Sequence, residues 1–441
     1  MFNDINDIYN MMFTFLSIVL MSRLIYISME NMNHGMSLRD FLYNILTRTF
    51  NPFRHLDSPN DIGSIYVKRS SGDTIKIGVL TNELPPIIYG GVSTWVVNFL
   101  NMFREHPVYE AIPIFLAYMD DAPESFYKNY TGIRVIKTHE DLVQVFKDID
   151  ICVNNLWIAN ETIMDIKYIY PDIPIITVCH SLIKMEHITN MGSQYTNNFP
   201  EQEKAFALSD FVVLISHAEE KYYRQFNYHT KYKAVPKVIY NMYSPKYDNK
   251  AFNVDYSNNT IGYIGRHVPR KRPELPIMAV TNVLKDKSLQ VYNMGVDPNN
   301  EYWKKIYQAY SDQMNIIHFT PDKSYIQKYW DNVGVNCITG IYEPFGYTIC
   351  ETLDRGVPAI VQNLDGPKEI IEEVKENVFL YDVHQDIKKD IENFSNALKQ
   401  FLETPPDVRK QMAKNARVAL DKLHPTVIQH DWVALFENLI Y

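Results

Sequence analysis

Two glutamates in the stretch IYEPFGYTICETLDRGVP, Glu343 and Glu351, have a spacing that suggests a shared ligand, with seven residues between them. Pro344 and Gly346 separate them and favour a loop or a tight turn over one continuous helix. We therefore expect Glu343 in a loop and Glu351 on a helix over residues 347–355. Two carboxylates would then lie around one helix N-terminus.

Apolar runs on both sides of this stretch indicate buried strands, over residues 333–338 and 357–361. The local order is strand, loop, short helix, strand. In α/β units of this kind, ligands bind at the loops that leave the carboxyl ends of strands and face helix N-termini. The sequence thus predicts a ligand site at the 339–346 loop.

Cations follow another predicted strand in the segment GYIGRHVPRKRPE. Arg266 comes directly after the strand, and Lys271 lies five residues later. An arginine can hold two phosphate oxygens at once and a lysine supplies a point charge, so the pair suits a bound anion. The alternative is a solvated basic loop.

A pair of glycines, Gly90 and Gly91, lies between a first strand, TIKIGVLT, and an amphipathic helix over residues 92–103. Glycines here let the backbone approach a ligand, and a helix N-terminus favours an anion. A plain turn explains the pair equally well. Two other polar residues, His180 and Ser216, lie just past predicted strand ends, where ligand contacts collect.

Strand and helix signals alternate from residue 74 onward, which is typical of parallel α/β sheets. A polar stretch at 244–258 separates two such series and suggests a hinge between two Rossmann-like domains. We predict an N-terminal extension with a linker (1–73), a first domain (74–250), a second domain (251–425) and a C-terminal helix packed back on the body (426–441).

The N-terminal extension contains an apolar run at 11–27 that is shorter than the ~20 residues of a spanning helix and has no Lys or Arg before it. It is interpreted as a helix packed on the body or on a partner subunit, or as a membrane-contacting helix. A second amphipathic helix is expected from Ser37, and 51–72 has the composition of a linker.

The composition is that of a globular protein: 441 residues, 46% hydrophobic and 22% charged, with a net charge of −9. This acidic balance argues against nucleic-acid binding. Four dispersed cysteines, three of them in apolar runs, indicate buried free thiols in a reducing compartment rather than disulfides or a metal cluster. We expect a cytoplasmic protein, with membrane association through residues 11–50 left open.

The order of these motifs, Gly-Gly loop, G-R-x4-K and E-x7-E, resembles the retaining glycosyltransferases of family four, which have the GT-B fold. The resemblance runs from about residue 74 to 441 and includes VCHSL, EKAFALSDFVVLIS and LDGPKEII. The sequence departs from the family pattern at four glycine or serine positions, which are Met242, Thr320, Gly340 and Asp365. These departures remove none of the charged residues of the motifs, so they bear on which sugar donor is used more than on whether sugar is transferred.

The resemblance implies a nucleoside-diphosphate sugar as donor and a hydroxyl acceptor on a glycan, a lipid or a protein-linked sugar. Arg266 and Lys271 would stabilise the leaving diphosphate, Glu343 would bind the donor sugar near its reacting face, and Glu351 would bind the ribose. His180 would reach the sugar from the opposite domain. The donor would also contact the two loops, at Gly90, Gly91, Phe345, Gly346 and Tyr347. It implies no metal or other cofactor, a hexosyl type of transfer, and a front-side displacement that retains configuration.

Two other functions fit the same pattern, namely a catalytically inert binding or scaffold subunit and another GT-B enzyme such as an epimerase or a phosphorylase. The intact charged residues of the motifs argue against the first, and the E-x7-E block argues against the second. Neither Asp120-Asp121 nor the group His180, Glu186 and His187 has the spacing of a known metal site.

Overall fold

The computed structural model describes residues 74–88, 90–119, 122–190, 199–246, 253–286, 288–296, 301–318, 323–384 and 386–439. All of these residues belong to one compact unit, Ile65–Tyr441. The predicted N-terminal helices, the linker and the pair Asp120-Asp121 lie outside the described residues. No helix in the described part of the chain has both the length and the apolar character needed to cross a bilayer.

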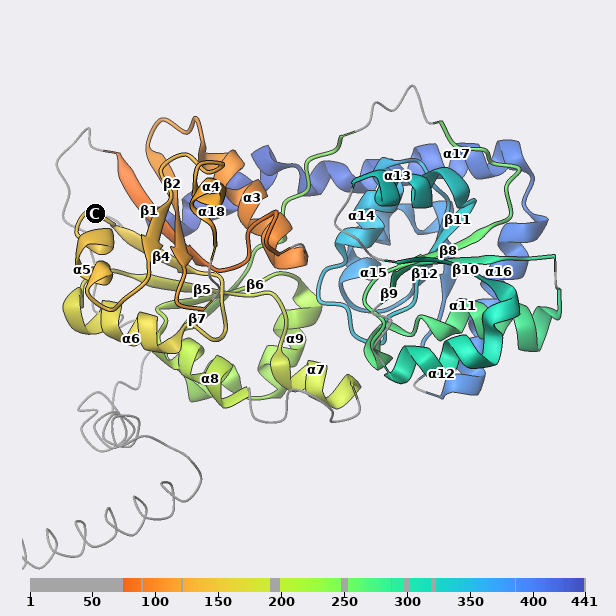
Figure 1. Cartoon of the computed structure of the whole chain (residues 1–441), viewed down its shortest axis with the longest axis horizontal. Helices are drawn as coiled ribbons and strands as arrows, with labels where there is room; N and C mark the ends of the chain where they lie inside the picture. The colour runs from red at the N-terminus through yellow and green to blue at the C-terminus, as the bar shows by residue number, and fades with distance from the viewer. Residues whose placement is uncertain are drawn as a thin grey trace, which may run out of the picture. The chain divides into compact units, whose positions relative to one another are not determined.

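The first sheet is parallel throughout and has the strand order β3-β2-β1-β4-β5-β6-β7 (Figure 1). Its strands are β1 (Ile75–Thr81), β2 (Tyr109–Leu116), β3 (Arg134–Ile136), β4 (Ile151–Asn154), β5 (Ile175–Cys179), β6 (Phe211–Leu214) and β7 (Val235–Val238). The intervening helices are α3 (Gly91–Phe103), α4 (Glu124–Tyr127), α5 (Asp141–Phe146), α6 (Asn160–Ile169), α7 (Ile183–Thr189), α8 (Phe199–Leu208), α9 (His217–Gln225) and α10 (Tyr228–Lys231).

The second sheet is also parallel and has the order β10-β9-β8-β11-β12-β13. Its strands are β8 (Ile261–Ile264), β9 (Val291–Val296), β10 (Met314–His318), β11 (Val335–Ile338), β12 (Ala359–Gln362) and β13 (Phe379–Tyr381). Around them lie α11 (Glu274–Met278), the π-helical turn η2 (Ala279–Leu284), α12 (Glu301–Tyr310), η3 (Ser311–Gln313), α13 (Lys323–Asn332), α14 (Tyr347–Asp354), α15 (Asp365–Ile371), η4 (Glu372–Asn377) and α16 (Ile387–Glu403). A short 3-10 turn, η1 (Pro269–Lys271), follows β8.

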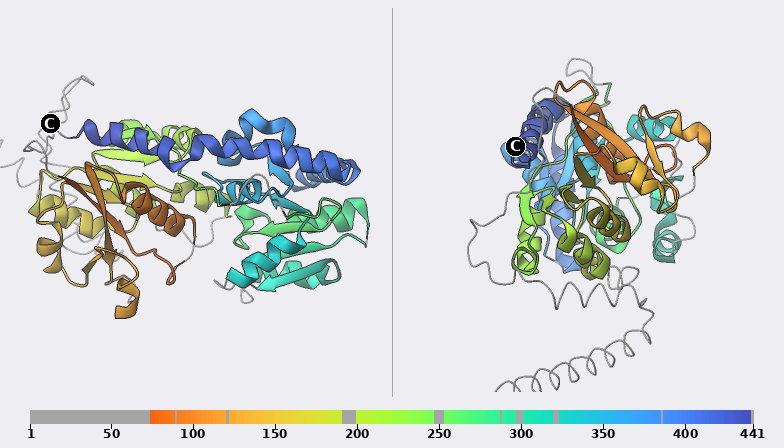
Figure 2. Two further views of the ribbon diagram at one scale, coloured as in Figure 1. Left: turned by 90° about the horizontal axis from the view of Figure 1, so that it is seen from above. Right: turned by 90° about the vertical axis from the view of Figure 1, so that its left-hand side faces the viewer.

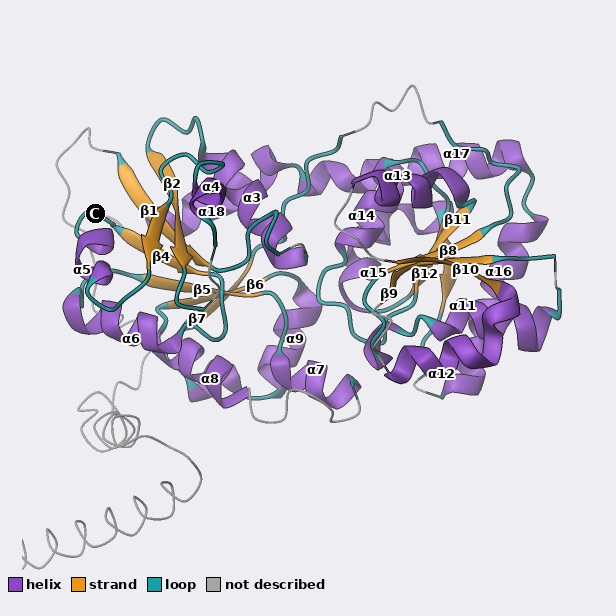
Figure 3. Ribbon diagram, in the orientation of Figure 1, coloured by secondary structure: helices purple, strands orange, loops and turns teal. Residues whose placement is uncertain are grey.

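Both sheets are covered by helices on their two faces (Figure 3), which explains why their central strands are buried and mainly apolar. The strands β4, β5, β11 and β12 consist of buried residues only. This arrangement confirms the predicted α/β class with two Rossmann-like domains. The strand β13, of only three residues, was not predicted, because so short a run carries no usable periodicity.

The chain ends in helices that extend from the second sheet back to the first (Figure 2): α17 (Pro406–Ala416), η5 (Arg417–Leu423) and α18 (Pro425–Glu437). Trp432 of α18 packs against Trp95 and Phe99 of α3, with ring centroids 5.8 and 5.0 Å apart. The apolar face predicted for the final helix therefore contacts the first domain.

Candidate active site

The loop between β11 and α14 carries Glu343, and backbone contacts define its shape. Gly346 caps α14 with φ of 100°, a left-handed conformation that favours glycine. The amide of Gly366 donates to the carbonyl of Glu343 at 3.0 Å. A Cβ on Gly366 would lie 2.5 Å from backbone atoms of Phe345 and Pro344, so only glycine permits this close approach. The acidic loop is therefore fixed against the start of α15.

Glu351 lies on α14, so the two glutamates belong to a loop and to a helix, as Pro344 and Gly346 predicted. Burial raises the pKa of Glu351 against the opposing charges of Arg355 and Lys246. Burial therefore favours the protonated form of this carboxyl group more than water does.

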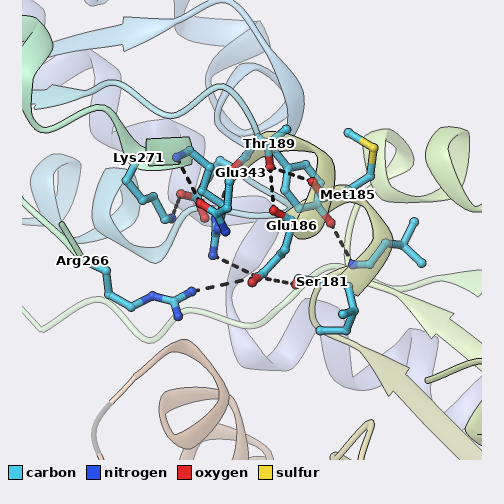
Figure 4. Close-up of polar contacts among 12 residues, drawn as sticks. Ser181, Met185, Glu186, Thr189, Arg266, Lys271 and Glu343 are labelled. Carbon is cyan, nitrogen blue, oxygen red and sulfur yellow. Dashed lines mark hydrogen bonds and ion pairs between the residues drawn. The ribbon is translucent and has the colours of Figure 1, made fainter. Parts of the chain in front are cut away.

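Lys271, the last residue of η1, forms an ion pair with Glu343 across the gap between two loops (Figure 4). Burial raises the pKa of Glu343, but the positive charges of Lys271 and Arg270 outweigh it and lower the pKa overall. Burial also lowers the pKa of Lys271 to about 8, against the effect of Glu343. Both groups are therefore mainly charged at neutral pH.

Glu186 of α7 brings the first domain into this cluster. Its Oε1 accepts hydrogen bonds from Ser181 at 2.6 Å and from Arg270 at 2.9 Å, and it lies 3.9 Å from Arg266 (Figure 4). Burial raises the pKa of Glu186, but the positive charges of Arg270 and Arg266 outweigh burial and lower the pKa overall. The carboxylate is therefore ionised. Arg266 itself is exposed over 60% of its side chain and keeps its guanidinium accessible to a ligand.

His180 follows β5 and contacts the first domain's own residues. Its Nε2 is hydrogen bonded to the Oδ1 of Asn155, and its ring meets Trp95 edge-on at 5.3 Å. Burial lowers its pKa to about 3, so the imidazole is neutral at physiological pH. In the described part of the chain, His180 bonds to Asn155 rather than to the charged cluster.

The two glycines lie at the beginning of α3, and Gly91 lies next to the start of α14. Gly91 is the first residue of the helix, and a Cβ on it would lie 3.7 Å from the ring of Tyr347. Tyr347 in turn packs against Phe345, with ring centroids 5.1 Å apart. Gly90 is extended, with φ of 176°, and therefore does not require glycine for its conformation. The structure thus brings both glycine-containing loops together.

Two residues of the charged cluster, Glu186 and Arg270, were not predicted as site residues. In the sequence, Glu186 drew attention only as part of a group whose spacing does not fit a metal site. Arg270 drew attention only as part of a basic run. The one available signal was an arginine next to Lys271 in an otherwise acidic chain. Among the described residues, no group of three or more His, Cys, Asp or Glu side chains is arranged to hold a metal ion.

The comparisons with known proteins agree with this geometry. Residues 247–419, which carry Arg266, Lys271, Glu343 and Glu351, match the family model "Glycosyl transferases group 1". The search of curated proteins found no match. The matched residues include the second sheet with its acidic and basic loops.

Several solved structures share the fold over most of the chain. HepE from Anabaena, solved with UDP and glucose, aligns with a TM-score of 0.62 at 17% identity over 83% of this chain and 100% of its own. Sucrose-phosphate synthase from Thermosynechococcus elongatus aligns with a TM-score of 0.64 at 18% identity, over 83% and 99%. TarM of S. aureus aligns with a TM-score of 0.64 at 13% identity, over 82% and 99%. At these identities the likeness shows the fold, which is GT-B.

Proposed function

We propose that this protein transfers a sugar from a nucleoside-diphosphate sugar to an acceptor hydroxyl, with retention of anomeric configuration. The observation that carries the proposal is the cluster of Arg266, Lys271 and Glu343 at the carboxyl edge of the second sheet. Two cations and a sugar-binding carboxylate at a helix N-terminus are what a diphosphate linked to a sugar requires. They lie in the part of the chain that matches the glycosyltransferase model.

The cations would stabilise the negative charge that develops on the leaving diphosphate. Arg266 is accessible, and Lys271 remains mainly protonated at neutral pH. Backbone N–H groups at the starts of α14 and α3, near Gly346 and Gly91, add donors for phosphate oxygens. Each preorganised donor of this kind is worth about 3–4 kcal/mol of transition-state stabilisation.

Glu343 would accept hydrogen bonds from hydroxyls of the donor sugar while Lys271 moves toward the phosphates. Because the two side chains are now paired, the donor would exchange one buried ion pair for two charge-assisted contacts. Glu351, on α14, would bind the ribose hydroxyls. Phe345 and Tyr347 would line the donor pocket beside Gly90 and Gly91.

In the chemical step, the bond from the anomeric carbon to the diphosphate oxygen breaks, and the acceptor oxygen bonds to the same face of that carbon. The acceptor proton moves to a phosphate oxygen of the leaving group. This front-side route needs no enzyme nucleophile and therefore no second carboxylate paired with Glu343. In the proposal, Glu351 on α14 binds the ribose instead. Neutral His180 would bind the donor sugar from the first domain.

The donor sugar is proposed to be a hexose, since similar structures were solved with UDP-glucose and with UDP. Arg266 and Lys271 supply positive charge for the diphosphate, so the proposal includes no metal. The acceptor is a hydroxyl on a glycan, a lipid or a protein-linked sugar. Four buried free cysteines accord with the reducing environment of the cytoplasm, our proposed location.

Thermal unfolding in the presence of UDP-, GDP- and ADP-sugars tests this proposal. A ligand at 100 times its Kd stabilises the fold by about 2.7 kcal/mol, so one donor class should raise the Tm by several degrees. Lys271→Ala should remove the shift. Lys204→Ala, which breaks an exposed ion pair with Glu201 on α8, should keep it. Stabilisation by no sugar nucleotide at millimolar concentration would refute the proposal.

A further inference from the structure

Arg270 lies in the middle of η1, and its guanidinium is buried, with 3% of the side chain exposed. The residues on either side of it in the basic run point elsewhere. Lys271 pairs with Glu343, and Arg272 pairs with Asp390 inside the second domain. Arg270 is thus the member of the run that connects the second domain to the first.

On the second-domain side, Arg270 holds the acidic loop by its backbone and its side chain. Its carbonyl accepts from the amide of Ile341 at 2.8 Å, and its Nη1 donates to the carbonyl of Tyr342 at 3.2 Å. Lys271 then contacts Glu343, so two consecutive residues of η1 contact two consecutive residues of the loop. The position of Glu343 follows from this double contact.

On the first-domain side, Arg270 contacts the middle of α7 and its C-terminal end. Its Nη2 donates to Glu186 at 2.9 Å, and its backbone amide donates to the Oδ1 of Asn190, which caps the helix, at 3.2 Å. The hydroxyl of Ser181, one residue after His180, donates a hydrogen bond to the same carboxylate of Glu186. The same guanidinium therefore bonds to α7 and to the loop that carries Glu343.

We propose that Arg270 is a positioning residue that transmits closure of the two domains to Glu343 and Lys271. The inference rests on the proposed function, because it assigns these two residues to the reaction. When Glu186 and Arg270 are in contact, the planar guanidinium orients the carbonyl of Tyr342 and thereby fixes the next residue, Glu343. When the domains separate, Arg270 loses one partner and the acidic loop loses one constraint.

The geometry requires an arginine, since its nitrogens lie in one plane and donate in two fixed directions. A lysine can neutralise Glu186 but cannot also hold the carbonyl of Tyr342 in a fixed geometry. Arg270→Lys therefore separates charge from positioning, and Glu186→Gln removes the charge while keeping a hydrogen-bond acceptor. Arg272→Lys is the matched control, because its ion pair is equally buried but touches neither α7 nor the acidic loop.

The test measures the steady-state rate of sugar transfer or of sugar-nucleotide hydrolysis. The kcat is calculated per nucleotide-binding site, so that unfolded protein, which binds no nucleotide, does not lower it. Arg270→Lys should lower kcat about 10- to 100-fold, since a displacement near 1 Å costs on this order, while the donor KM changes less than threefold. Glu186→Gln should lower kcat in the same way. The double variant should be no slower than the slower single variant, because both changes remove one interaction.

The inference is overturned if Arg270→Lys retains wild-type kcat, if the two losses add, or if Arg272→Lys lowers kcat to the same extent. A different result would refute the proposed function itself, namely a wild-type protein that neither binds nor turns over any sugar nucleotide. The two failures are thus distinguished by the behaviour of the wild-type protein.

Discussion

Glu219 of α9 is a fully buried carboxyl group whose replacement gives a quantitative prediction. It accepts hydrogen bonds from the hydroxyl of Tyr342, at 2.8 and 3.0 Å, and from the amide of Leu182 at 2.6 Å. Tyr342 directly precedes Glu343, and Leu182 precedes α7. We predict that Glu219→Gln, which keeps the shape and an acceptor oxygen, makes the protein more stable than wild type at alkaline pH.

The magnitude follows from the pKa. Burial raises the pKa of Glu219 from an ordinary value of 4.5 to about 8, against the hydrogen bonds from Tyr342 and Leu182. Between these values the folded protein holds a proton that the unfolded chain has released, so stability falls as pH rises. The slope is about 1.36 kcal/mol per pH unit and falls to half of that at pH 8, where the folded group is half ionised, so wild type loses about 2.3 kcal/mol through this group between pH 6 and 8. The Glu219→Gln variant has no titratable group at this position and therefore does not lose this stability.

The assay is thermal unfolding of both proteins from pH 6 to 8. The Tm of Glu219→Gln minus that of wild type should grow by about 3 °C over this range. Glu203→Gln is the control, since Glu203 also accepts from two tyrosines but has a lowered pKa and is ionised throughout the range, whether folded or unfolded. Its difference from wild type should be constant. A constant difference for Glu219→Gln as well would refute the reasoning.

Three further predictions concern the site and the core. Lys271→Ala and Glu343→Ala should each lower sugar transfer at least about 100-fold, measured by product formation, with an unchanged circular dichroism spectrum; full turnover by both would exclude the proposed site. Gly366→Ala should lower both Tm and activity, because its Cβ would lie 2.5 Å from the backbone of the acidic loop; wild-type activity would contradict that account of the loop. Trp432→Ala should cost about 3–5 kcal/mol in denaturant unfolding, whereas Val427→Ala, 46% exposed on the same helix, should cost under about 0.5 kcal/mol; equal losses would mean that α18 does not pack through Trp432.

The sequence predicted the elements of the site because each depends on local signals. Pro344 and Gly346 indicated the loop before α14, and the helix ends at Asp354, just before Gly356 with its φ of 68°. Apolar runs located β11 and β12 on either side. Because loops at the carboxyl ends of parallel strands meet at one edge, the proximity of Lys271 to Glu343 also followed from the order of the elements.

The contacts between the domains could not be predicted in this way. Arg270 and Glu186 are 84 residues apart, and Tyr342 and Glu219 are 123 apart. No periodicity or cap relates such positions, since each contact depends on how the two sheets face one another. The basic run illustrates the limit, because Arg270, Lys271 and Arg272 are adjacent in sequence but pair with three different acids.

The central claim is that the cluster of Arg266, Lys271 and Glu343 breaks the bond between a sugar and a nucleoside diphosphate. It is tested most directly by measuring nucleoside-diphosphate release from the donor that stabilises the fold, with mixed glycan and lipid acceptors. The account predicts release by wild type and by Lys204→Ala, and loss of release in Lys271→Ala and Glu343→Ala. Release at the buffer rate by wild type, or equal release by all four proteins, would contradict it.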